Sequence, residues 1–304
     1  MVEHEQISNR TPLFSIIIAV YNDWAVLEGC LQSLAQQTNG PCFEVIIVDD
    51  GSTEPAPDFV RGSSFSYPLM VISQPHSGIP VARNRGIRNS KGAVLLFVDA
   101  DSRLQTTCLA ALASVIANAP RHNCFQLRLV GNCLNLVGRA EELRLITFQH
   151  HMLQPDGRIR YLNTAGFAIR RTRVDIQAGV FDPLAFRAED TLLLADLMQA
   201  GEIPLFVPDA RVEHYIPLSL AGCFRKDIRS AYLEGRTYNL IASKGVRIRL
   251  TNRERLQLIT SMWKTARQPS IGRPAWFVLA FRQTIRRTIS FGYKCLRIGA
   301  RRHT

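Results

Sequence analysis

Two carboxylates stand one residue apart at the end of an apolar run, in the segment LLFVDADSRL over residues 95–104. Asp99 and Asp101 would repel each other, and the low dielectric beside a protein core strengthens that repulsion. A polar turn with a helix-capping aspartate is the ordinary explanation for such a pair. The alternative is a divalent cation between the two groups, because hard cations prefer oxygen ligands and Mg²⁺ usually takes one or two protein carboxylates.

Two other apolar runs also end in polar and acidic residues. The run FSIIIAV leads into Tyr21, Asn22 and Asp23, and the run FEVIIV leads into Asp49 and Asp50. Turn chemistry explains one such ending more easily than three. The repeated pattern therefore favours a polar site to which several strand ends contribute.

The elements that carry these residues are apolar strands that alternate with helices. Strands are predicted over residues 14–20, 43–50, 67–73 and 93–99, and helices over 24–38 and within 77–90. Strands that are apolar along their whole length indicate a parallel sheet covered on both faces, and ligands bind beyond the carboxyl ends of such strands. We therefore predict an α/β fold with a doubly wound, mostly parallel sheet flanked by helices.

Further candidates lie in the second half of the chain. Glu189 and Asp190 stand in the opening turn of a helix predicted over 186–201, where the helix dipole favours ionised carboxylates. Such a group can accept a proton from a hydroxyl nucleophile, although acids are also common in first turns for structural reasons. A strand and loop over 203–215 deliver His214, and a lone histidine after a strand is more often structural or solvent-facing.

The positive charge is concentrated at the C-terminal end. Residues 221–304 contain 19 Lys and Arg against 3 Asp and Glu, whereas residues 1–220 contain 18 against 22. This asymmetry predicts a larger domain over 1–220 and a basic, mainly helical region over 221–304. Seven cysteines without C-x-x-C spacing indicate reduced thiols, and the polar N-terminus predicts no secretory signal. Both features favour a cytoplasmic location.

The basic region contains an amphipathic pattern over 273–302, in which apolar residues recur at three- and four-residue spacing among arginines. Its longest uncharged run is the eight residues 274–281, far short of the ~20 that cross a bilayer. Peripheral docking on the inner face of the cell membrane is one interpretation, since each Lys or Arg near an anionic leaflet contributes about 1 kcal/mol. Packing against the larger domain is the other. No recognition motif for nucleic acid accompanies the charge.

Taken in order, seven segments of this chain resemble the GT-A type of family-2 glycosyltransferase. They are SIIIAVYND, EVIIVDDGST, GIPVARNRGI, GAVLLFVDADS, TAGFAIRR, FRAEDTLLLADLMQAG and VPDARVEHY, and they span about residues 13–216. The resemblance implies the GT-A fold for residues 1–220 and sugar transfer, with inversion, from a nucleotide-diphosphate sugar, in the first instance a UDP-sugar. It also implies a divalent cofactor, Mn²⁺ or Mg²⁺. The expected acceptor is a saccharide or lipid-linked hydroxyl, as in cell-surface polysaccharide or glycolipid synthesis.

The resemblance also implies roles for individual residues. Those expected to bind the nucleotide-sugar are Tyr21, Asp49, Asp50, Arg83, Asn84 and Asp99. Those expected at the metal are Asp99, Asp101 and His214. Asp190 matches the catalytic base, with Glu189 beside it. One departure is Ala19, which stands where relatives often have a hydroxyl residue, so one contact to the base is absent or replaced.

Two other functions are compatible with parts of this pattern. A sugar nucleotidyltransferase shares the sheet, the nucleotide and the metal, but residues 19–25 lack the glycine-rich, basic phosphate loop expected after its first strand. A catalytically inactive relative would serve as a membrane-associated scaffold. The presence of Asp99, Asp101 and Asp190 argues against that second alternative.

Overall fold

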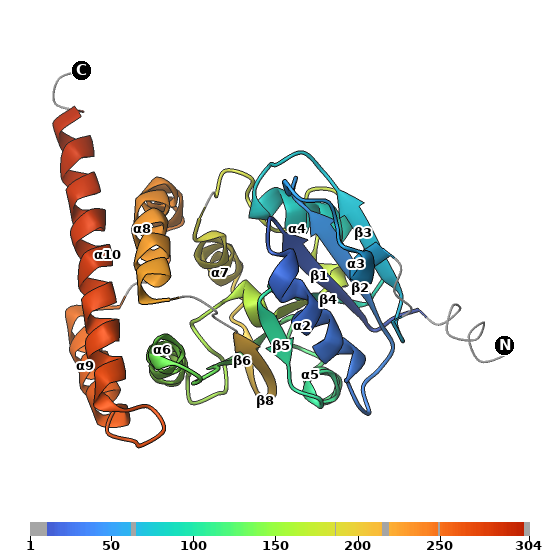
Figure 1. Cartoon of the computed structure of the whole chain (residues 1–304), viewed down its shortest axis with the longest axis horizontal. Coiled ribbons are helices and arrows are strands. Elements are labelled where there is room, and N and C mark those ends of the chain that lie inside the picture. Colours follow the sequence, from blue (N-terminus) through green and yellow to red (C-terminus); the bar gives the residue numbers. More distant parts are fainter. Residues whose placement is uncertain (1–10, 62–64, 186, 215–218, 249, 301–304) are drawn as a thin grey trace, which may run out of the picture.

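The structure is a computed structural model of the 304-residue chain, and it describes residues 11–61, 65–185, 187–214, 219–248 and 250–300 (Figure 1). Residues 1–10, on which the prediction of no secretory signal depends, lie outside the described residues. Phe186 and Tyr215, which belong to two of the seven segments, also lie outside them, as do residues 301–302 at the end of the predicted basic helix.

One sheet organises the described part of the chain, with strand order β3-β2-β1-β4-β7-β6-β8-β5. Its first half consists of β1 (Phe14–Val20), β2 (Phe43–Asp49), β3 (Leu69–Ser73) and β4 (Val94–Phe97). These four strands pair in parallel, so their carboxyl ends lie along one edge. All four lie where the apolar runs predicted strands.

The second half of the sheet is mixed. It consists of β5 (Ser102–Leu104), β6 (Cys124–Gly131), β7 (Phe167–Arg170) and β8 (Leu205–His214). β7 runs antiparallel to β4 and β6, whereas β8 runs parallel to β6 and antiparallel to β5. Strands β5 and β6 were not predicted, because β5 is only three residues long and Gln126 and Arg128 interrupt the apolar run of β6. The predicted α/β, mostly parallel fold class is confirmed.

Helices cover both faces of the sheet, as the strand pattern predicted. Ile16 and Ile18 of β1 belong to the core that includes Leu27 of α2 (Trp24–Ala35), while Ile17 faces a second core with Ile87 of α4 (Ile79–Arg88). Alternate residues of one strand thus serve opposite faces. A Cβ on Gly86 would lie 2.4 Å from the Ile17 Cγ2 atom, so this glycine lets α4 pack directly against β1.

Among the described residues between 11 and 214, the remaining α-helices are α3 (Asp58–Arg61), α5 (Cys108–Asn118), α6 (Leu136–Met152) and α7 (Glu189–Gln199). Helix α7 begins at Glu189 rather than near residue 186, because Ala188 adopts a left-handed backbone with φ of 61°. Gly201, with φ of 79°, follows the end of α7 as the sequence predicted.

Three helices form the C-terminal region and lie beside α6 at one end of the molecule (Figure 1). They are α8 (Leu220–Ser243), α9 (Asn252–Thr265) and α10 (Arg273–Ala300). Ala275 and Leu279 of α10 are buried with Ala140 and Leu143 of α6, so one face of the predicted basic helix packs on the preceding domain. The domain boundary at residue 220 stays a prediction. Within the described residues, no helix combines the length and hydropathy needed to cross a bilayer.

Candidate active site

The acidic strand ends meet at one edge of the sheet. The backbone N–H of Asn22, after β1, donates to the Ser52 hydroxyl oxygen, after β2, at 2.9 Å. Burial raises the pKa of Asp23, and the charges of Asp101 and Asp99 raise it further. Side chains that follow three different strands therefore lie close enough to interact electrostatically.

Asp99, Asp101 and His214 form a cluster at this edge. One ligand atom from each residue lies within 4.8 Å of the others, and the His214 Nε2 atom is 3.3 Å from the Asp101 Oδ2 atom. Backbone pairing of β5 with β8 places Ser102 opposite His214, which brings the residue preceding Ser102 to the imidazole. The sequence had His214 in a loop after a strand, whereas it is the last residue of β8.

The charges in this cluster favour a cation. Burial by itself would raise the pKa of Asp101, but His214 and Lys226 outweigh it and hold the pKa below its usual range. Burial lowers the pKa of His214, whereas Asp101, Glu141 and Asp99 together raise it above its usual value. The surplus of carboxylates therefore stabilises positive charge at this point.

The donor set fits a divalent ion. Two carboxylates and one imidazole offer two oxygens and one nitrogen, and carboxylate-rich sets suit Mn²⁺ and Mg²⁺. The alternative, that Asp101 caps the following helix, is wrong, because α5 begins at Cys108 with Thr107 at its N-cap. Helix capping therefore does not offset the repulsion between the Asp99 and Asp101 carboxylates, and positive charge must do so.

Arg83 links this cluster to the start of α7. Its Nη2 group donates to Asp99 Oδ1 at 2.8 Å and its Nη1 group donates to Glu189 Oε1 at 2.8 Å. The side chain is only 4% exposed, and its guanidinium carbon lies 5.4 Å from the centre of the Phe181 ring. Burial opposes the charged form, yet Asp99 and Glu189 raise the pKa of Arg83, so the bridge stays ionic.

Asp190 follows Glu189 in the first turn of α7 and is partly buried. Its Oδ1 atom accepts hydrogen bonds from the Thr191 backbone N–H at 2.6 Å and from the Thr191 hydroxyl at 3.2 Å. Burial, with the neighbouring charge of Glu189, raises the pKa of Asp190 to about 7. The sequence predicted that the helix dipole would keep this group ionised, but desolvation outweighs the dipole here. A carboxylate with this pKa can take up a proton near neutral pH.

Tyr21 and Asp50 flank a loop that carries His76. The Tyr21 ring is exposed and stacks on the His76 ring, with centroids 4.1 Å apart. The buried Asp50 carboxylate accepts hydrogen bonds from Gln74 Nε2 at 2.7 Å and from the Ser77 and Gly78 N–H groups at 2.9 and 2.8 Å. His76 Nδ1 lies 2.9 Å from Asp50 Oδ2. Asp50 thus holds this loop beside Tyr21, and its contact with a base stays a prediction.

Asp49 and Asn84 also make contacts within the protein. Asp49 Oδ1 accepts a hydrogen bond from the Ser52 N–H at 2.9 Å, which shapes the turn after β2. The buried Asn84 donates to the Phe181 carbonyl at 2.7 Å and accepts from the Val180 and Phe181 N–H groups at 3.2 and 3.1 Å. These bonds direct the Asn84 amide to the loop before α7, and its place in the nucleotide site stays a prediction.

Comparison with known proteins decides the family. Residues 15–178, more than half of the chain, match the model of the family described as Glycosyl transferase family 2. The chain belongs to glycosyl transferase family 2. The resemblance expected from the sequence motifs is confirmed. Glu189, Asp190 and His214 lie beyond the matched stretch, so their roles depend on geometry.

Curated relatives share only part of their length with this family-2 chain. An uncharacterized glycosyltransferase of Escherichia coli K12, YibD, is 35% identical over 108 residues, which are 35% of this chain and 31% of YibD. A PGL/p-HBAD biosynthesis glycosyltransferase of Mycobacterium tuberculosis H37Ra is 39% identical over 108 residues, which are 34% of this chain and 42% of the relative. The matches thus span less than half of either relative.

Solved structures resemble the family-2 chain along most of its length. TarS 1–349 of Staphylococcus aureus in complex with UDP has a TM-score of 0.55 and 20% identity, covering 92% of this chain and 91% of TarS. The mannosyltransferase PcManGT of Pyrobaculum calidifontis, in complex with GDP-Man and Mn²⁺, has a TM-score of 0.60 and 15% identity, covering 93% and 88%. This likeness concerns the fold, and it confirms the predicted GT-A architecture.

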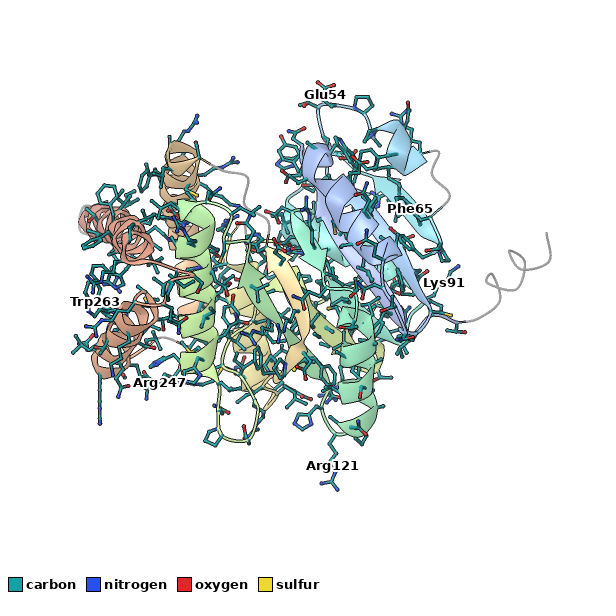
Figure 2. All side chains as sticks on the ribbon, turned by 60° about the horizontal axis from the view of Figure 1, so that its bottom comes forward. Glu54, Phe65, Lys91, Arg121, Arg247 and Trp263 are labelled. Carbon is teal, nitrogen blue, oxygen red and sulfur yellow. The ribbon has the colours of Figure 1, made fainter. Side chains whose placement is uncertain are left out.

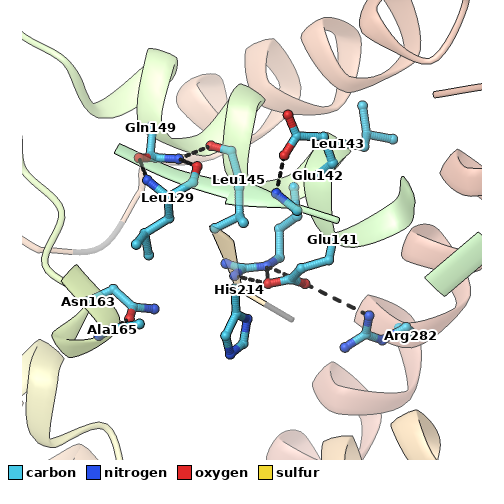
Figure 3. A network of polar contacts seen from close by, with 12 residues as sticks. Leu129, Glu141, Glu142, Leu143, Leu145, Gln149, Asn163, Ala165, His214 and Arg282 are labelled. Atoms are coloured by element: carbon cyan, nitrogen blue, oxygen red, sulfur yellow. Dashed lines mark hydrogen bonds and ion pairs between the residues drawn. The ribbon is translucent and has the colours of Figure 1, made fainter. Parts of the chain in front are cut away.

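Sequence reasoning missed the residues behind His214 in this family-2 site. Glu141 of α6 is buried there and pairs with Arg144, and its carboxylate lies 4.0 Å from Arg282 Nη1 of α10 (Figure 3). Burial opposes ionisation, but Arg144 and other positive groups lower the pKa of Glu141 to about 2. The local sequence around Glu141 does not predict that this residue lies near His214. Its neighbours are His214 of β8, Arg282 of α10 and Arg144, one turn further along α6. His76 was missed for the same reason.

Proposed function

We propose that this family-2 chain is an inverting glycosyltransferase that moves a sugar from a nucleotide-diphosphate sugar to a hydroxyl of a saccharide or lipid-linked acceptor. The observation that carries the proposal is the Arg83 bridge, which joins Asp99 of the acidic cluster to Glu189, the neighbour of Asp190. A donor site and a candidate base are thereby held in one rigid arrangement.

The donor nucleotide binds at the carboxyl ends of β1 and β2. The exposed face of Tyr21 stacks on the base, and the loop held by Asp50 and His76 lines the base pocket. Asp49 supports the turn beneath it, and Asn84 holds the neighbouring loop in place. The UDP complex of TarS and the GDP-Man complex of PcManGT support a nucleotide-sugar. We propose a UDP-sugar as the donor.

Asp99, Asp101 and His214 would hold the divalent ion, Mn²⁺ or Mg²⁺. When bound there, the ion stabilises the negative charge that develops on the departing diphosphate. Arg83 keeps one Asp99 oxygen oriented, because its Nη2 group donates to that oxygen. Glu141, behind His214, adds a further negative charge near the cluster and raises the pKa of the imidazole. Mn²⁺ in the PcManGT complex supports this assignment.

Asp190 acts as the base. Its carboxylate accepts the proton of the acceptor hydroxyl while the acceptor oxygen bonds to the anomeric carbon, and the bond between that carbon and the diphosphate oxygen breaks. The nucleoside diphosphate leaves on the opposite side, so the configuration inverts. The Thr191 N–H and hydroxyl hold one Asp190 oxygen, which leaves the other for the acceptor. Glu189, bonded to Arg83, lies beside the acceptor hydroxyl.

We further propose that residues 1–220 form the catalytic domain and that residues 221–304 attach it to an anionic membrane at the inner face of the cell membrane. The M. tuberculosis relative, named for PGL/p-HBAD biosynthesis, supports a role in glycolipid or cell-surface polysaccharide synthesis. The excess of positive charge in residues 221–304 supports attachment to an anionic membrane.

The test is release of nucleoside diphosphate from a panel of nucleotide-sugars, with Mn²⁺, with Mg²⁺ and with a chelator. We expect metal-dependent hydrolysis of a UDP-sugar, lost in Asp101→Asn and retained in Asp209→Asn, an exposed aspartate of β8. Donor binding without turnover under any condition would favour the inactive scaffold. Equal activity of wild type and Asp101→Asn would remove the metal assignment.

A further inference from the structure

An exposed aromatic surface lies on the outer side of α9 and α10. We define the aromatic face as Ile259, Trp263, Trp276 and Phe277, which with Thr260 line a shallow hollow between the two helices. Phe277 is 59% exposed and Ile259 is 42% exposed. Figure 2 shows Trp263 at the outer edge of the molecule, on the side opposite Phe65 and Lys91. Exposed apolar side chains gathered in one hollow make this face a candidate interaction surface.

The aromatic face is separate from the contacts that hold α9 and α10 on the protein. Leu258 of α9 and Ala275 and Leu279 of α10 are buried, and the last two pack with α6. The ring of Trp263 instead packs edge-to-face on Trp276 at 5.1 Å. The helices therefore already have a buried side, and the aromatic face needs an outside partner to be covered.

Positive charge surrounds the aromatic face. Arg253 and Lys264 line a second hollow on α9 that shares Thr260 with the first, and the Arg267 guanidinium lies 6.0 Å from the centre of the Trp263 ring. The acidic side chains that the structure describes in this region, Asp227 and Glu254, are already paired with arginines. The surface thus presents basic groups and aromatic rings together.

We infer that the aromatic face is the surface that docks on an anionic lipid bilayer. Aromatic rings with a polar edge favour the headgroup level of a membrane, and neighbouring Lys and Arg side chains bind lipid phosphates. A second copy of this chain is disfavoured as the partner. Residues 221–304 carry 19 basic against 3 acidic residues, so two copies of this region would repel each other. Stacking of nucleic-acid bases is disfavoured because Trp276 and Arg267 already contact Trp263.

This inference names the surface that would carry out the proposed membrane attachment. The benefit of that attachment, access to a lipid-linked acceptor, rests on the proposed function. Arg282 of α10 bonds to Asp227 of α8 at 2.7 Å, and its Nη1 atom lies 4.0 Å from the carboxylate of Glu141, the α6 residue behind His214. Arg282 therefore joins α10 to the carboxylate behind His214. A bilayer on the aromatic face would lie against the helices that pack on α6, and α6 contributes Glu141 to the candidate site. A lipid-linked acceptor would be held in that bilayer.

The test uses the full chain and two kinds of vesicle, pure phosphatidylcholine and phosphatidylcholine with one third phosphatidylglycerol. We expect sedimentation with the second kind, weakened by salt, and a blue shift of tryptophan emission. The chain has three tryptophans, and Trp24 is buried, so the shift reports Trp263 and Trp276. The variant Leu256→Ser/Phe277→Ser changes Phe277 of the aromatic face and Leu256 of the adjoining hollow on α9, which are both exposed. Its vesicle affinity should fall about 10- to 100-fold.

Leu134→Ser, which changes a leucine that is 75% exposed outside the aromatic face, should bind vesicles like wild type. Arg253→Glu/Lys264→Glu should lose the preference for phosphatidylglycerol. Equal binding of wild type and Leu256→Ser/Phe277→Ser would overturn the inference, as would a dimer in sedimentation velocity that this variant abolishes. Hydrolysis of the donor in solution should be unchanged in all three variants. If a variant loses vesicle binding but keeps hydrolysis, the result tests the membrane surface alone. If the wild type shows no hydrolysis, the result contradicts the proposed function instead.

Discussion

Arg83 and Glu189 are 106 residues apart in the chain, and their side chains form an ion pair of 2.8 Å. The same guanidinium binds Asp99 at 2.8 Å. One buried side chain therefore sets the separation between the candidate metal site and the candidate base. Because a guanidinium is planar and its donors have fixed directions, this separation is reproducible.

We predict that Arg83→Lys lowers kcat about 10- to 100-fold with a smaller effect on KM for the donor. A lysine ammonium is a single point charge and does not span Asp99 and Glu189 in the same plane. Steady-state kinetics on the preferred nucleotide-sugar checks this. Arg88→Lys, on the exposed side of α4, is the matched control, and equal kinetics in the two variants would contradict the bridging role.

The pH profile should report Asp190. A base works in its deprotonated form, and the pKa of Asp190 is raised to about 7, so kcat/KM should rise with pH through about 7 and then level off. Asp190→Asn should lower kcat about 10²- to 10⁴-fold and remove this rise. The rate is measured across pH at saturating metal. A rise that persists in the asparagine variant would assign the titration to another group.

Glu189→Gln should shift that profile in a defined direction. Burial is the largest cause of the raised pKa of Asp190, and the negative charge of Glu189 is the second largest. Its removal lowers the pKa of Asp190, so the rise in kcat/KM should move to lower pH. The measurement is the midpoint of the pH profile relative to wild type. A midpoint that is unchanged or higher would show that the two carboxylates do not interact in this way.

His214→Gln should weaken Mn²⁺ binding at least about tenfold. The imidazole is the one nitrogen donor of the cluster, and it lies 3.3 Å from Asp101. Isothermal titration with Mn²⁺ measures the affinity directly, without dependence on activity. Replacement of His122, a histidine outside the cluster, by glutamine should leave the affinity unchanged. Wild-type affinity in His214→Gln would restrict the ligands to the carboxylates.

Gly179→Ala should destabilise the fold more than Gly201→Ala. Both glycines have positive φ, 81° and 79°, so the backbone strain of an alanine, about 1–2 kcal/mol, is common to both. At Gly179 the added Cβ would lie 2.2 Å from Asn84 Oδ1, whereas at Gly201 it would meet nothing within 4 Å. Thermal unfolding measures both. An equal loss of stability in the two variants would show that the Asn84 side chain moves away from the added Cβ at little cost.

Much of the fold was predictable from local patterns. The apolar runs of β1, β2 and β4 and the polar residues that end them encode a parallel sheet with an acidic edge, because burial and strand direction depend on neighbouring residues. Asp99 and Asp101 were recognised as a pair for that reason. The first turn of α7, with Glu189 and Asp190, was also recognised locally, although Ala188 delayed its start.

Other features depend on residues distant in sequence. The orientation of Asn84 toward residues 180–181 and the position of Glu141 behind His214 each need two or three elements to pack. The basic helix is a similar case. Its amphipathic pattern was visible in the sequence, but which apolar residues pack on α6 and which stay exposed followed from tertiary contacts.

The sequence by itself determined the family, the parallel half of the sheet and the carboxylates at its edge, because each depends on short, contiguous patterns. Only the tertiary structure decided that β5 pairs with β8 to bring Asp101 to His214, that Arg83 joins Asp99 to Glu189, and that burial raises the pKa of Asp190. Distances and desolvation arise from segments that meet only after folding, so no local pattern encodes them.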